Sequence, residues 1–84
     1  MYIKDLKGKD KECVIEMIKF LQVEENNSFY SLSEMFSNGT NGNFTEEITE
    51  FIVRILYENE GLLEKGGNGN YRRKREIMYF TIDW

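Results

Sequence analysis

Apolar residues recur at helical spacing in the first third of the chain. The stripe begins just after Asp10 and consists of Val14, Met17, Ile18 and Leu21, widened by Cys13, Ile15 and Phe20. This period predicts a first helix over about residues 11–23, with Asp10 as its N-cap. Because the stripe is wide, we expect the helix to be buried on more than one side, beneath the other elements or at a dimer seam.

The most regular stripe lies between residues 46 and 59. Its apolar positions fall at i, i+3, i+4, i+7 and i+8, and they are Ile48, Phe51, Ile52, Ile55 and Leu56. Thr45 or Asn43 can cap the start of this helix, and Gly61 stands where a left-handed residue ends one. The pattern predicts a long helix over about residues 46–59.

A capping box predicts a short helix between these two. The Ser31 hydroxyl can accept from the Glu34 amide, while the Glu34 carboxylate can accept from the Ser31 amide. We expect this helix to run from Leu32 to about Ser37 and to bury Leu32, Met35 and Phe36. Residues 28–30 before it form a candidate short strand, and the Asn- and Gly-rich residues 38–43 after it form a loop.

After Gly61 the apolar pattern changes from a helical period to strand alternation. A short apolar arm is followed by the Gly and Asn residues 66–70, which suit a tight turn, and then by a long arm rich in aromatic and β-branched residues. We predict an antiparallel hairpin over residues 61–82. Alternation assigns Met78, Phe80, Ile82 and Trp84 to the core face of the long arm, and Ile77, Tyr79 and Thr81 to the other face.

At 84 residues the chain has room for one small domain, which we place at residues 10–84 after an N-terminal arm at 1–9. No apolar run approaches the roughly 18 residues of a membrane span, and no signal peptide precedes the domain, so we expect a cytoplasmic protein. The sequence has no His and one Cys, which excludes a Cys/His zinc site and a Cys–His catalytic pair. We therefore expect no enzyme, no metal and no cofactor.

The charge of the chain is unevenly distributed. Its formal net charge is −4, yet residues 65–75 contain five cations and no acid, namely Lys65, Arg72, Arg73, Lys74 and Arg75. Clustering of one sign against the global charge is typical of a surface that binds nucleic acid. A solvated polar hairpin would show the same cluster, and the sequence alone favours neither interpretation.

The order of elements resembles the winged-helix domain over roughly residues 10–82. The resemblance depends on that order, on the capping box of Ser31 and Glu34, and on the Gly-Gly-Asn-Gly-Asn turn followed by Arg72 and Arg73. It implies an α+β fold of three helices, with the C-terminal hairpin as the wing and a candidate short third strand. It also implies that the third helix enters the major groove of DNA while wing cations touch the backbone. By position, the groove-facing residues would be Thr49, Glu50, Val53, Arg54 and Tyr57.

The third helix departs from that pattern in charge. Residues 46–60 contain five Glu and a single Arg, and acids near DNA oppose binding to phosphates. Two hypotheses follow. In the first, the chain is a small, homodimeric DNA-binding protein, a regulator or accessory factor of a bacterial genome or mobile element, whose wing grips the phosphate backbone. In the second, its acidic third helix docks a basic protein surface without nucleic acid.

Overall fold

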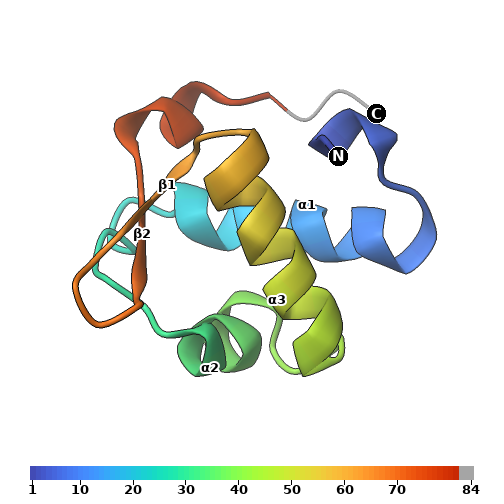
Figure 1. Cartoon of the computed structure of the whole chain (residues 1–84), viewed down its shortest axis with the longest axis horizontal. Coiled ribbons are helices and arrows are strands. Elements are labelled where there is room, and N and C mark those ends of the chain that lie inside the picture. The colour runs from blue at the N-terminus through green and yellow to red at the C-terminus, as the bar shows by residue number, and fades with distance from the viewer. Residues whose placement is uncertain (82–84) are drawn as a thin grey trace.

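A computed structural model describes residues 1–81 and shows three helices and an antiparallel hairpin, which confirms the predicted α+β class (Figure 1). The helices are α1 (Gly8–Gln22), α2 (Leu32–Glu34) and α3 (Glu46–Arg54), and the strands are β1 (Leu63–Lys65) and β2 (Tyr71–Arg73). Single 3-10 turns lie at η1 (Ile3–Asp5) and η4 (Arg75–Tyr79), and π-helical turns extend α2 and α3 as η2 (Met35–Gly39) and η3 (Ile55–Asn59). The hairpin and η1 lie at opposite sides of the molecule.

Helix α1 lies behind α3 and supplies the centre of the core (Figure 1). Its buried side chains are Cys13, Val14, Met17, Ile18 and Leu21. The helix begins at Gly8 rather than at Lys11, so the prediction of Asp10 as the N-cap is wrong. Gly8 has a φ of +62°, which allows the chain to turn from the extended Lys7 directly into the helix. Ile3 and Leu6, from the N-terminal arm, are buried in the same core.

The capping signals are confirmed. Ser31 Oγ accepts from the Glu34 amide at 3.1 Å, and Glu34 Oε1 accepts from the Ser31 amide at 2.9 Å. Thr45 Oγ1 accepts from the Ile48 amide at 3.1 Å, and Gly61 adopts a φ of +67° just beyond η3. Together α3 and η3 span residues 46–59, as the apolar period predicts.

The buried face of α3 is turned by about one position from the predicted face. Phe51, expected in the core, is 37% exposed, whereas Thr49 and Val53, expected on the outer face, are each 1% exposed. Thr49 can be buried because its hydroxyl donates to the Thr45 carbonyl at 3.0 Å and so leaves no unpaired polar atom. The prediction from apolar spacing treated Thr49 as polar and therefore misplaced the centre of the buried face of α3.

The hairpin is shorter than predicted. Leu63 pairs with Arg73, Glu64 with Arg72 and Lys65 with Tyr71, and β2 then ends. The prediction of a long second strand is wrong, because the chain beyond Lys74 folds into η4. Gln22 stabilises η4 by donating its Nε2 to the carbonyls of Ile77 and Phe80.

The short η4 turn moves Ile77 from the expected outer face into the core, whereas Tyr79, Met78 and Phe80 keep the sides that were predicted for them. Ile77 is fully buried, Tyr79 is 74% exposed, and Met78 and Phe80 are half-buried against the core. The predicted core positions Ile82 and Trp84 lie outside the described residues. At the other edge of β2, the candidate third strand is reduced to one antiparallel bridge between Tyr30 and Tyr71.

Candidate nucleic-acid interface

The hairpin presents two faces that differ in composition. Lys65 and Tyr71 are register partners and point to one face, whereas Glu64 and Arg72 point to the other. The turn that joins the strands is closed by a hydrogen bond of 2.7 Å from the Gly66 amide to the Asn70 carbonyl. The five predicted cations are therefore distributed over both faces of the hairpin and the segment after β2 rather than gathered at the hairpin tip.

Arg73 is a structural residue of the fold. Its guanidinium donates to the carbonyls of Leu21 at 2.8 Å and Glu24 at 2.9 Å, and also to that of Val23. These carbonyls are at the C-terminus of α1 and just beyond it, where helical backbone acceptors lack partners. Arg73 is half-buried in these contacts, so a phosphate could not engage it fully without releasing the helix end.

Arg72 is accessible but already has partners. Its Nε donates to Glu64 Oε1 at 2.8 Å, and its guanidinium carbon lies 4.4 Å from the centre of the Phe29 ring. The side chains of Arg72 and Glu64 are 44% and 38% exposed. An ion pair this exposed contributes only about 0–1 kcal/mol, so Arg72 can exchange Glu64 for a phosphate at little cost.

Three of the five predicted cations, called the hairpin cations below, have no ion pair within residues 1–81: Lys65 at the end of β1, and Lys74 and Arg75 just after β2. Lys65 and Arg75 are exposed, and Lys74 is half-buried. Lys65 Nζ lies 5.6 Å from the ring centre of Tyr71 and 6.0 Å from that of Tyr57, which places a cation beside two aromatic rings.

The residues predicted on α3 do not form one groove-reading face. Thr49 is buried, and Arg54 pairs with Glu50 at 3.1 Å, so its charge is partly neutralised. Tyr57 is 37% exposed and packs edge-on against Tyr71, with ring centres 5.6 Å apart, so it belongs with the hairpin. The exposed surface of α3 is mainly acidic, and its exposed acids are Glu46, Glu47 and Glu50.

Phe29 is a candidate binding residue that the sequence does not reveal. It is 39% exposed and lies beside the hairpin tip, where it lines a hollow of about 250 Å³ with Gly66, Gly67, Asn68 and Asn70. In the sequence Phe29 is one apolar residue within a polar segment. In the fold, the bridge between Tyr30 and Tyr71 places Phe29 beside the turn, where Arg72 contacts its ring.

Neither a reactive thiol nor a metal centre is found among residues 1–81. Burial raises the pKa of the Cys13 thiol to about 11, so at neutral pH it is protonated and unreactive. Within residues 1–81 no group of His, Cys, Asp and Glu side chains could hold a metal ion.

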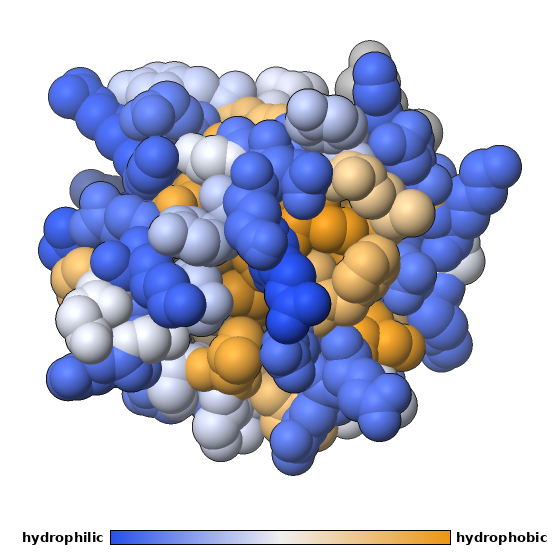
Figure 2. All heavy atoms as spheres, viewed as in Figure 1, coloured by the Kyte–Doolittle hydropathy of each residue, from blue (hydrophilic) through white to orange (hydrophobic). Residues whose placement is uncertain are grey.

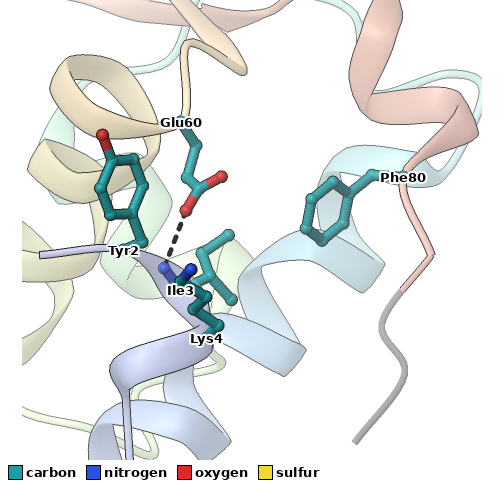
Figure 3. Close-up of a pocket in the computed structure, with 5 residues that line it drawn as sticks. All are labelled: Tyr2, Ile3, Lys4, Glu60 and Phe80. Carbon is teal, nitrogen blue, oxygen red and sulfur yellow. Dashed lines mark hydrogen bonds between the residues drawn. The ribbon is translucent and has the colours of Figure 1, made fainter.

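A hollow of about 310 Å³ lies where the start of the chain approaches Glu60 and Phe80, and Tyr2, Ile3 and Lys4 line its other side (Figure 3). Its carboxylate is already engaged, because Glu60 Oε2 accepts from the Ile3 amide at 2.8 Å. This contact attaches η1 to the end of η3, which gives Glu60 a structural role.

Comparisons of the chain with models of known protein families, with curated proteins and with solved structures found no match. Among the described helices, none has the length and apolar character needed to cross a membrane. A functional assignment therefore depends on the geometry and charge of the hairpin.

Proposed function

We propose that this protein binds nucleic acid through its β-hairpin, with α3 kept out of the groove. One observation carries the proposal: in a chain of net charge −4, Lys65, Lys74 and Arg75 have no ion pair within the described residues. Lys65 lies on β1 beside the exposed ring of Tyr57, and Lys74 and Arg75 follow directly after β2. Cations interleaved with aromatic rings suit a ligand that has both phosphates and bases.

The arrangement favours backbone binding over reading of sequence. Each cation that neutralises a phosphate releases a counterion and adds to affinity, but phosphate contacts carry no direct sequence information. A homodimer would double the contacts that one hairpin makes. We propose a cytoplasmic regulator or accessory factor of a bacterial genome or mobile element that works in this way.

Replacing Lys65, Lys74 and Arg75 together with alanine is expected to weaken binding to a labelled oligonucleotide at least tenfold at low salt. Because up to three phosphate contacts are lost, the slope of log K against log salt concentration should become shallower by about 2 to 3. Fluorescence anisotropy at several salt concentrations measures both quantities.

The matched control replaces Lys4, Lys7 and Lys19, three exposed cations outside the hairpin, and changes the net charge equally. Thermal unfolding of both variants verifies that they are folded. If the two triple variants bind alike, or if the unmodified protein shows no salt-dependent binding, the proposal is rejected.

The outer surface of α3 supports a second candidate function, docking of a basic protein surface. Glu50 stands between two hollows, each of which has a second carboxylate and an apolar wall. One, of about 130 Å³, is lined by Glu46, Glu50, Leu32, Ser33 and Phe36, and the other, of about 210 Å³, by Glu47, Glu50, Phe51 and Arg54. Figure 2 shows hydrophobic side chains exposed among hydrophilic ones on the face that includes α3. A Lys or Arg side chain could pack its stem on such a wall and place its charge beside the carboxylates.

An arginine-rich peptide serves as the probe for this second function. We expect its binding to perturb the backbone amide signals of α3 in NMR spectra, and replacement of Glu46, Glu47 and Glu50 with Gln to weaken it several-fold. The control variant carries Gln at Glu12, Glu24 and Glu25, which are exposed and outside α3. Equal weakening in both variants would mean attraction to the net charge alone and would exclude a docking site on α3.

A further inference from the structure

We propose that the hollow beside the hairpin tip holds one unpaired base of a single-stranded nucleic acid. This tip pocket is formed by Phe29, Gly66, Gly67, Asn68 and Asn70 and has a volume of about 250 Å³. The inference rests on the proposed function and specifies its ligand: a flexible single strand, whose base faces are open, in preference to a duplex.

The stacking wall of the tip pocket is the Phe29 ring. The ring is 39% exposed, and it contacts two neighbours, Arg72 and Gly66. The guanidinium of Arg72 lies 4.4 Å from its centre, and Gly66 approaches so closely that an added Cβ would lie 3.0 Å from Phe29 Cε1 and 3.1 Å from Cδ1. An aromatic ring that is open to solvent can stack on any base, because every base has a π face.

Two amide groups complete the tip pocket. An Asn side chain has both donors and an acceptor, and it can pair with the edge of a base, most favourably adenine. The side chains of Asn68 and Asn70 make no hydrogen bond within the described residues, so both amides are available. The backbone of Asn70 is fixed by accepting from the Gly66 amide at 2.7 Å, which limits the positions that its side chain can take.

A phosphate partner lies next to the stacking wall. Arg72, which contacts Phe29, makes only an exposed ion pair with Glu64, and a phosphate can replace that carboxylate. A stacked base on Phe29 and a phosphate on Arg72 would therefore belong to neighbouring parts of one strand. In a duplex the base faces are already stacked on one another, so the same base would first have to leave the helix.

Anisotropy measurements with a labelled oligodeoxyadenylate and its duplex test the inference directly. We expect the single strand to bind at least tenfold more tightly than the duplex. Phe29→Leu should weaken single-strand binding roughly 5- to 150-fold, the range expected for loss of one stacked base. The matched control is Phe51→Leu, because Phe51 is 37% exposed on α3 and should leave binding unchanged.

A pair of glycine variants tests the position of the ring without removing it. Gly66→Ala should weaken single-strand binding because its Cβ displaces Phe29, whereas a Cβ at Gly67 meets nothing within 4 Å and Gly67→Ala should bind normally. Phe29→Tyr should also bind normally, and thermal unfolding verifies that each variant is folded.

The possible outcomes separate the inference from the proposed function. Absence of binding to either form of DNA rejects both. Single-strand binding that persists in Phe29→Leu and Gly66→Ala but is lost on removal of the hairpin cations rejects the tip pocket alone, as does preference for the duplex. If adenosine monophosphate competes as strongly as the oligonucleotide at equal concentration, the pocket takes a free nucleotide, and the single-strand inference is rejected.

Discussion

Arg73→Ala is expected to lower the free energy of unfolding by about 2–3 kcal/mol, because hydrogen bonds from a charged donor contribute about 1.5–3 kcal/mol each and do not add fully. The guanidinium serves three carbonyl groups at the end of α1, and alanine would leave them to water. For a chain of this size the loss corresponds to a fall of roughly 10–20 °C in Tm.

Thermal unfolding followed by circular dichroism measures this effect. Arg73→Lys should recover part of the stability, since an ammonium can serve some of the carbonyls but lacks the planar fork. The control is Arg72→Ala, which removes an exposed ion pair and should change stability by less than about 1 kcal/mol. Equal effects at the two positions would show that Arg73 does not hold the end of α1 in solution.

Ile77→Ala is expected to destabilise the protein by about 2–5 kcal/mol, the usual range for truncating a fully buried Ile. The side chain is 0% exposed in η4, and its carbonyl accepts from Gln22 Nε2 at 3.0 Å. A long second strand would instead place Ile77 on the outer face, where truncation has little effect. The substitution therefore distinguishes the observed η4 turn from the strand that the alternation of residues 77–84 suggests.

Urea denaturation provides the measurement, and Tyr79→Ala provides the control. Tyr79 is 74% exposed, so its loss should change the free energy of unfolding by no more than about 0.5 kcal/mol. If Ile77→Ala does not fold, Ile77→Val should still cost about 0.5–1.5 kcal/mol. Similar small values for Ile77 and Tyr79 would contradict the packing of η4 on α1.

The cations of residues 65–75 illustrate the limit of charge clustering as a guide to a binding site. They are neighbours in the sequence, but they have different roles in the fold. Arg73 secures α1, Arg72 contacts Glu64 and Phe29, and Lys65, Lys74 and Arg75 have no ion pair among the described residues. The cluster offered five candidate contacts, whereas among the described residues the structure leaves three of these cations without an ion pair and a fourth in an exchangeable one.

The sequence by itself determined the elements whose signals are local. The capping box of Ser31 and Glu34, the Thr45 cap and the span of residues 46–59 depend on partners within a few residues, so their geometry is the same wherever the element packs. The position of the hairpin turn is local for the same reason, since Gly and Asn tolerate its backbone angles.

Only the tertiary structure decided which side chains those elements would bury or expose. Arg73 reaches carbonyls about 50 residues away, Phe29 meets a turn that lies far along the chain, and α3 buries Thr49 because α1 covers that side. Each of these contacts is made with residues that are distant in the sequence and become neighbours only when the chain folds. The periodicity of apolar residues within one element therefore cannot predict them. The tip pocket therefore appears only in the fold, although each of its residues is visible in the sequence.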